Sequence, residues 1–221
     1  MLNIENYIET LIVLLKRDFN SRLLYVGLQG SYLRGEANEN SDIDIMVIID
    51  DLSIKDLEVY KKAIDSNGNS DKACGFICGK SELINWNVCE ICHLIHTTKD
   101  YYGQLSEFVP KYKKEDEINF IKMSLNNLYH GLCHAYIHAT EMENIEKLPF
   151  AYKSVFFILQ NIYYIKTGEF IQTKKELIPR LLGEDKKVFI KALEIEKNAV
   201  FDFEEAYCVL FNWCKNAIIK M

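Results

Sequence analysis

The sequence predicts an α+β protein, in which a mixed α/β domain is followed by an all-helical bundle. In the first half of the chain, short apolar runs typical of buried strands alternate with helical periods and with turn residues. From about residue 118 onward the strand patterns disappear and long helical periods take over. This change predicts two domains, residues 1–115 and 116–221, joined around residues 109–111.

The N-terminal domain is expected to contain a mixed sheet with flanking helices. Apolar side chains recur at helical spacing after Asn3, which is a suitable N-cap residue. Leu23 to Leu28 is an apolar run of strand length, and Gly68 lies in a polar turn that separates a helical period from another short apolar run. The expected helices are 3–19 and 53–64, and the expected strands are 23–28, 42–49 and 73–78.

The C-terminal domain is expected to consist of five helices. Thr173 and Asp202 each precede a glutamate by three residues, which is the spacing of a capping box. Gly168 is placed to end one helix, and Pro179 is expected to shorten or bend another. The expected ranges are close to 118–141, 149–166, 174–182, 184–198 and 202–220.

Composition restricts the cellular setting and the class of partner. The chain has 221 residues, of which 49% are apolar, but it contains no uninterrupted apolar run long enough for a membrane span, and its first residues lack the pattern of a signal peptide. We therefore expect a cytoplasmic protein whose seven cysteines are mostly reduced. The formal charge of −6, without a basic stripe, argues against nucleic acid as a partner.

One group of residues in the sequence, a Gly-Ser turn followed by two aspartates, indicates binding of phosphate and of a cation. Gly30 and Ser31 follow the first expected strand, where glycine allows a sharp turn and a close approach to a bulky anion. A short helix opening at Ser31 would direct its first N–H groups at phosphates, and Arg34 lies one turn further on, in reach of a phosphate oxygen. Asp42 and Asp44 alternate along the next expected strand and so share one face, while the residues between and after them are apolar. Paired carboxylates in an apolar run favour a bound cation, and Mg²⁺ is commonly held by one or two carboxylates together with substrate phosphates.

The motif from Gly30-Ser31 to Asp42-Ile43-Asp44-Ile45 resembles the signature of the DNA polymerase β-like nucleotidyltransferase superfamily. The order of an α/β domain and a helical bundle is similar to that of bacterial aminoglycoside nucleotidyltransferases. The resemblance implies Mg²⁺-dependent transfer of a nucleoside monophosphate, with AMP from ATP as the expected case, to a hydroxyl of a small molecule such as an aminoglycoside-like acceptor. It implies that Ser31 holds the β- and γ-phosphates and that Asp42 and Asp44 bind the metal and act in catalysis. Together with the reasoning from Gly30 and Arg34 above, this gives Gly30, Ser31 and Arg34 as the expected nucleotide-binding residues.

The chain departs from this superfamily at one position. Family members usually carry a third carboxylate on the next central strand, but residues 73–78 contain no acid. Asp71, Glu82 or an acid of the helical domain are the possible substitutes. In the helix expected at 118–141, His134 and Glu141 belong to a polar face that also contains His130 and His138. Glu141 or His134 is the candidate general base for the acceptor hydroxyl, and Glu141 is the one assigned to the site.

The missing acid also allows a second function, in which the same fold binds a nucleotide or a protein partner, as an antitoxin-like or regulatory protein does, without transfer. The sequence does not identify the acceptor, the preferred base or the oligomeric state. The pattern Cys89-Glu90-Ile91-Cys92-His93 matches the attachment motif of c-type haem, but we interpret these cysteines as buried thiols rather than as a haem or zinc site.

Overall fold

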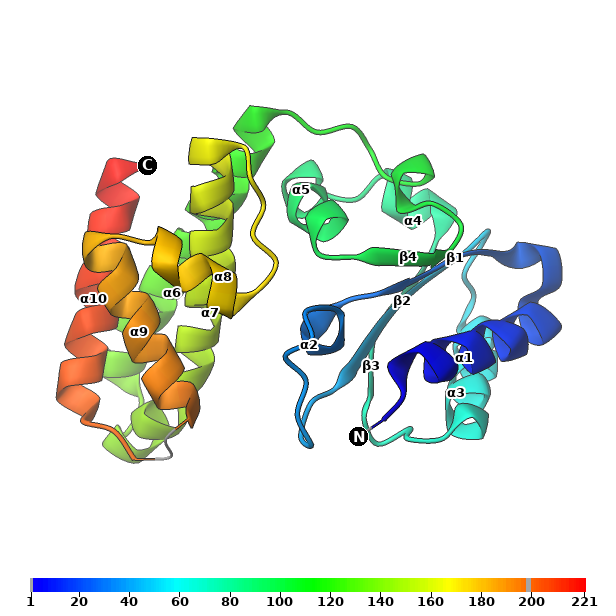
Figure 1. Cartoon of the computed structure of the whole chain (residues 1–221), viewed down its shortest axis with the longest axis horizontal. Helices are drawn as coiled ribbons and strands as arrows, with labels where there is room; N and C mark the ends of the chain where they lie inside the picture. Colours follow the sequence, from blue (N-terminus) through cyan, green and yellow to red (C-terminus); the bar gives the residue numbers. More distant parts are fainter. Residues whose placement is uncertain (1, 198–199) are drawn as a thin grey trace. The chain divides into compact units, whose positions relative to one another are not determined.

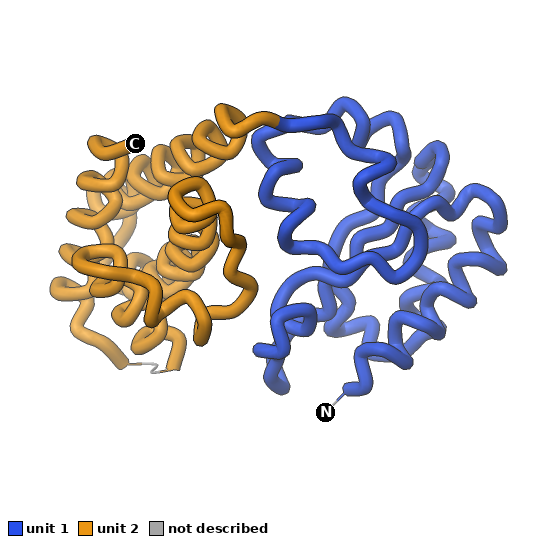
Figure 2. Tube along the Cα trace, turned by 45° about the horizontal axis from the view of Figure 1, so that its top comes forward, with its two compact units in different colours: residues 1–112 blue, residues 113–221 orange. Residues whose placement is uncertain are grey.

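The computed structural model describes residues 2–197 and 200–221, and these form two compact units. Unit 1 comprises Met1–Tyr112 and unit 2 comprises Lys113–Met221 (Figure 2). Each unit has its own hydrophobic core, so each is described separately below.

Unit 1 is built on a four-stranded mixed sheet with the strand order β3-β2-β1-β4 (Figure 1). β1 pairs antiparallel with both β2 and β4, whereas β2 and β3 run parallel. The elements of unit 1 are α1 (Ile4–Phe19), η1 (Asn20–Arg22), β1 (Leu23–Leu28), α2 (Gly30–Leu33), β2 (Ile43–Ile49), α3 (Ile54–Asn67), β3 (Ala73–Gly79), α4 (Lys80–Ile84), α5 (Val88–His96), β4 (Lys99–Tyr102) and η2 (Leu105–Glu107).

The two faces of this sheet belong to different cores, because side chains alternate along each strand. Ile43, Ile45 and Val47 of β2 pack with α1 and α3. Met46 and Ile48, which point to the other face, pack with residues of β3, α4 and α5. The alternation puts Asp44, the second residue of β2, on the same face as Met46.

Local capping fixes the helices that support the sheet. The side chain of Asn3 accepts a hydrogen bond from the N–H of Asn6 at the start of α1. Ser53 and Asp56 form a reciprocal capping box at the start of α3. Arg22 donates to both carboxylate oxygens of Asp56, at 2.7 and 3.1 Å, and so links the segment before β1 to the start of α3.

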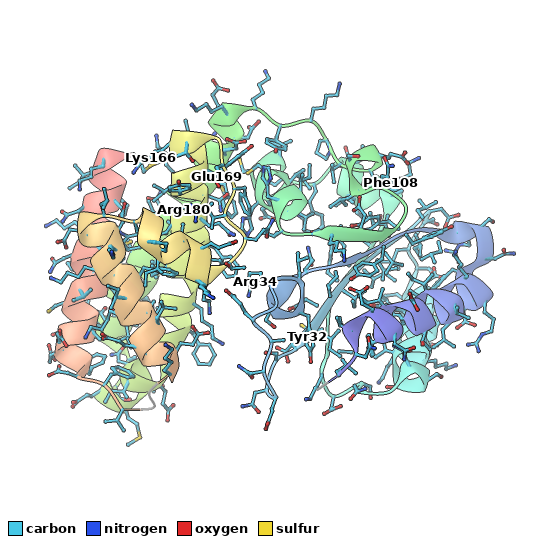
Figure 3. All side chains as sticks on the ribbon, in the orientation of Figure 1. Tyr32, Arg34, Phe108, Lys166, Glu169 and Arg180 are labelled. Carbon is cyan, nitrogen blue, oxygen red and sulfur yellow. The ribbon has the colours of Figure 1, made fainter. Side chains whose placement is uncertain are left out.

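Unit 2 is entirely helical in its described part, and α7 forms much of its core. Ten residues of α7 are buried, and the hydroxyl of Tyr152 donates to the carbonyl oxygen of Ala206 at 2.7 Å. At the periphery, Arg180 and Glu169 approach to 3.5 Å (Figure 3). The elements of unit 2 are α6 (Lys114–His138), α7 (Glu141–Thr167), α8 (Lys174–Leu177), η3 (Ile178–Arg180), α9 (Gly183–Lys197) and α10 (Phe203–Lys220).

The predicted α+β fold class is confirmed, but several element boundaries were wrong. The helix expected from residue 149 begins at Glu141, because Thr140 and Glu143 form a capping box there and Pro149 lies inside the helix without ending it. β4, α4 and α5 were not predicted. The expected end of one helix at residue 198 lies outside the described residues. No helix in the described part of the chain has the length and apolar character needed to span a membrane.

Candidate functional site

The two predicted metal-binding aspartates lie at the start of β2. Asp42 is exposed and immediately precedes the strand, and Asp44 is its second residue and is half-buried. Ile43 and Ile45 are buried in the core on the opposite face. The strand therefore holds the Asp44 carboxylate at the boundary between core and solvent. Asp42, just before the strand, is exposed to solvent.

Gly30 packs directly against the carboxylate of Asp44. A Cβ atom placed on Gly30 would lie 1.8 Å from Oδ2 of Asp44, which is far inside van der Waals contact, and Gly30 has a φ of +68°. The backbone N–H of Gln29 donates to the carbonyl oxygen of Asp44 at 2.9 Å. The close approach and the left-handed backbone both require glycine at position 30.

Burial raises the pKa of the Asp44 carboxyl, and repulsion from Asp42 raises it further. A hydrogen bond with the side chain of Cys74 and the positive charge of Arg34 act in the opposite direction. Two carboxylates that repel each other at a partly desolvated position form an environment that a cation would stabilise.

Ser31, Tyr32 and Arg34 follow Gly30 in and just after the short helix α2. All three are half-buried, and Figure 3 labels Tyr32 and Arg34 beside this helix. The Nε of Arg34 donates to Oε2 of Glu36 at 2.9 Å, and the N–H of Glu36 donates to the carbonyl oxygen of Ser31. These bonds close the loop after α2 and hold the Arg34 guanidinium close enough to Asp44 to affect its pKa.

Cys74 occupies the position on β3 that lies beside Asp44. The parallel register pairs Asp44 with Cys74, and the two side chains are hydrogen-bonded. The two candidate acids near this strand lie outside it: Asp71 precedes β3 and is exposed, and Glu82 is an exposed residue of α4. The neighbour of Asp44 on β3 is therefore a thiol and not a carboxylate.

Gln29 and Thr98 were not predicted as part of this region. The side-chain amide of Gln29 donates to the hydroxyl of Thr98 at 2.8 Å, and that hydroxyl donates to the carbonyl oxygen of Leu94 at 2.7 Å. These bonds fasten the backbone just before Gly30 to the segment that enters β4. Thr98 could not be found from the sequence, because β4 itself lacks an apolar strand pattern.

The residues predicted from the helical half lie in unit 2. Glu141 is the first residue of α7, and His134 lies in the last turns of α6; both are exposed. The structure thus brings together Gly30, Asp44 and the charge of Arg34 in unit 1, whereas Glu141 belongs to a separate unit.

The residues at the start of β2 fit a bound Mg²⁺. Asp42 and Asp44 offer hard carboxylate oxygens, and Mg²⁺ sites formed by one or two carboxylates plus substrate phosphates are common. Within residues 2–197 and 200–221, no group of three or more His, Cys, Asp and Glu side chains is arranged to hold a metal ion.

Comparisons with known proteins agree with this geometry. The family model described as "Nucleotidyltransferase domain" matches residues 10–91, a segment that contains Gly30, Asp42 and Asp44. No curated protein sequence is significantly similar to the chain.

Among solved structures, the spectinomycin adenyltransferase AAD(9) from Enterococcus faecialis, with ATP and spectinomycin, has 15% sequence identity and a TM-score of 0.62. The match covers 96% of this chain and all of that one, and it shows a shared fold. A toxin–antitoxin structure with AMP-PNP is 24% identical over 62% of this chain and 94% of the other, and its TM-score of 0.34 is too low to compare the folds. Residues 10–91 of this chain are thus similar in sequence to a nucleotidyltransferase domain, and this segment contains the turn that packs against Asp44.

Proposed function

We propose that the chain is a Mg²⁺-dependent nucleotidyltransferase that moves AMP from ATP to a hydroxyl group of a small molecule. The observation that carries this proposal is the contact between the Gly30 turn and the Asp44 carboxylate. The turn that we propose to bind phosphate packs against one of the two carboxylates that we propose to bind Mg²⁺, and this proximity supports binding of a metal–triphosphate complex.

Different site residues bind different parts of the metal–nucleotide complex. Ser31 and the first N–H groups of α2 bind phosphate oxygens, since N–H groups in the first turn of a helix have no acceptor within the helix. Arg34 adds a positive charge beside them. Asp42 and Asp44 hold Mg²⁺, which when bound neutralises charge on the triphosphate and orients it.

In the reaction, the acceptor hydroxyl oxygen forms a bond to the α-phosphorus while the bond between that phosphorus and the oxygen bridging to the β-phosphate breaks. Pyrophosphate leaves, and the hydroxyl proton passes to a base. We propose Glu141 for that base. Glu141→Gln is then expected to slow transfer without weakening ATP binding, whereas Glu146→Gln, an exposed acid on the same helix, has no effect.

The donor and acceptor are proposed from the full-length fold match. The matched adenyltransferase structure contains ATP and spectinomycin, and we take ATP and hydroxyl-rich aminocyclitol or aminoglycoside compounds as the first substrates to test. Acceptor-dependent release of pyrophosphate from ATP measures the reaction for each compound.

Substitution of the two aspartates tests the mechanism. Asp42→Asn and Asp44→Asn are each expected to keep the fold, measured by circular dichroism, and to abolish acceptor-dependent release of pyrophosphate. Asp65→Asn is the matched control, because Asp65 is an exposed acid of the same unit on α3. Full activity in either site variant would contradict the proposed role of these residues.

A second candidate function is nucleotide binding without transfer, and Cys74 is the observation that favours it. The position beside Asp44 on β3 carries a thiol, which does not replace a carboxylate as a metal ligand or base for Mg²⁺ chemistry. Under this alternative, Mg²⁺·ATP binds in a calorimetric titration and Asp44→Asn weakens that binding, but no acceptor gives pyrophosphate.

A further inference from the structure

The helical unit carries a row of histidines that the proposed reaction does not use. His130, His134 and His138 are three of the five histidines in the chain, and they follow one another at four-residue spacing on α6. Residues four apart on a helix are neighbours on one face. All three side chains are exposed, so core packing does not explain them.

The rings of this row lie close to one another. The ring centroids of His134 and His138 are 4.7 Å apart, and those of His130 and His134 are 6.1 Å apart. Among the described residues, the structure gives these three imidazoles ring contacts with each other but no hydrogen bond or ion pair to another residue. Their nitrogens are therefore available to an external ligand.

We propose that His134 and His138, on successive turns of α6, each contribute one imidazole nitrogen to bind a first-row transition-metal dication of the Ni²⁺, Cu²⁺ or Zn²⁺ type. Two histidines spaced i, i+4 on one helical face form a metal-chelating pair. Imidazole suits these ions, whereas Mg²⁺ prefers oxygen ligands. Water completes the coordination, and His130, which is farther from His134, gives a weaker alternative pair.

This site is independent of the proposed transferase reaction. Asp42 and Asp44 offer carboxylate oxygens in unit 1, while the histidine pair offers nitrogens in unit 2. The two cation sites thus differ in donor chemistry, and each can be removed by substitution without touching the other.

Titration of the full-length, reduced protein with Ni²⁺ alone tests the proposal. In isothermal titration calorimetry, His134→Ala and His138→Ala are each expected to weaken Ni²⁺ binding by about tenfold or more, because each variant loses one of the two imidazole ligands. His130→Ala has a smaller effect, since it leaves the closer pair intact. His93→Ala, in α5 of unit 1, is the matched control and leaves the affinity unchanged.

Two further measurements separate chelation on the folded helix from other Ni²⁺ binding. Ni²⁺ is expected to raise the melting temperature of the wild-type protein and of the Asp42→Asn, Asp44→Asn double variant, but not that of His134→Ala, because a ligand that binds only the folded state stabilises it. In NMR spectra, the imidazole signals of His134 and His138 broaden first as Ni²⁺ is added. Unchanged Ni²⁺ affinity in a His134→Ala, His138→Ala double variant, or first broadening at His93 and His96, would overturn the proposal.

Discussion

Gly30 is the residue whose replacement tests the geometry of the site most directly. Gly30→Ala places a methyl group on the Asp44 carboxylate and keeps a φ of +68°, which costs a residue with a side chain about 1–2 kcal/mol. We expect lower stability in urea denaturation and a large loss of Mg²⁺·ATP affinity, since Asp44 must move away from its position.

Gly35→Ala provides the control for Gly30→Ala. Gly35 has nearly the same backbone angle, a φ of +67°, but no atom lies within 4 Å of the place where its Cβ would be. The expected loss of stability is therefore similar to the backbone cost at Gly30, while Mg²⁺·ATP affinity is retained. Equal losses of affinity in the two variants would show that the contact with Asp44 is not responsible.

Cys74 gives a second prediction at the scale of single residues. Its side chain is hydrogen-bonded to Asp44, and a group that hydrogen-bonds to a metal-binding side chain helps to orient that side chain. Cys74→Ala is expected to weaken Mg²⁺·ATP binding and Cys74→Ser to preserve it, because serine keeps a donor. Cys208→Ala, at an exposed cysteine of α10, is the control, and equal affinities for the alanine and serine variants at position 74 would contradict the prediction.

Some residues of the site could be predicted from the sequence and others could not. Gly30 and Asp44 belong to a motif with fixed local spacing, so their types and order could be interpreted without a structure. Cys74 and Thr98 reach the same region only through strand register, which depends on pairing between distant segments. The strand that contains Cys74 was predicted, but its pairing with Asp44 was not, and no local pattern marks Thr98.

At the scale of elements, the connection between Arg22 and Asp56 stabilises the start of α3. Asp56 accepts hydrogen bonds from Arg22 and from Ser53, and these hold the pKa of its carboxyl far below the usual range, with the bond from Arg22 as the largest cause. Asp56→Asn is expected to cost about 1.5–3 kcal/mol at neutral pH, measured by urea denaturation, because bonds to a charged group are lost.

The pH dependence of that cost follows from the direction of the pKa shift. Because the pKa is depressed in the folded state, the stabilisation by Asp56 is complete above the pKa of an unfolded aspartate, about 3.9, and is lost as the pH falls below it. The stability difference between wild type and Asp56→Asn should therefore shrink below about pH 4. Asp50→Asn is the control: Asp50 also accepts from Arg22 but is half-exposed, so its loss has a small effect at any pH.

Elements with regular apolar patterns could be predicted, whereas elements defined by tertiary contacts could not. The strand expected at 23–28 matches β1, because its apolar run is continuous. β4 contains Lys99 and Asp100 among four residues at the edge of the sheet, so its sequence carries no strand pattern. The helix expected from residue 149 begins at Glu141, because the caps at Thr140 outweigh the single N–H that Pro149 lacks.

At the scale of the whole molecule, the separation of the hydrophobic cores leads to a prediction about the two units. Every residue of the core around Tyr152 and Trp213 belongs to unit 2, while the cores on the two faces of the sheet belong to unit 1. We expect residues 113–221, expressed alone, to unfold cooperatively in a thermal melt followed by circular dichroism, and residues 1–112 to bind Mg²⁺·ATP. A fragment 113–221 without a cooperative transition would show that its core depends on the other unit.

The contact between Gly30 and Asp44 also has a consequence for how this site can change in evolution. Because the glycine is required partly by its neighbour's carboxylate, the two positions are not free to vary separately: a side chain at position 30 becomes tolerable only after the acid at position 44 has shortened or gone. Loss of the metal ligand therefore removes the contact that helps to preserve the glycine. In descendants of such a domain, a residue other than glycine at position 30 would therefore indicate that cation binding at position 44 had been lost first.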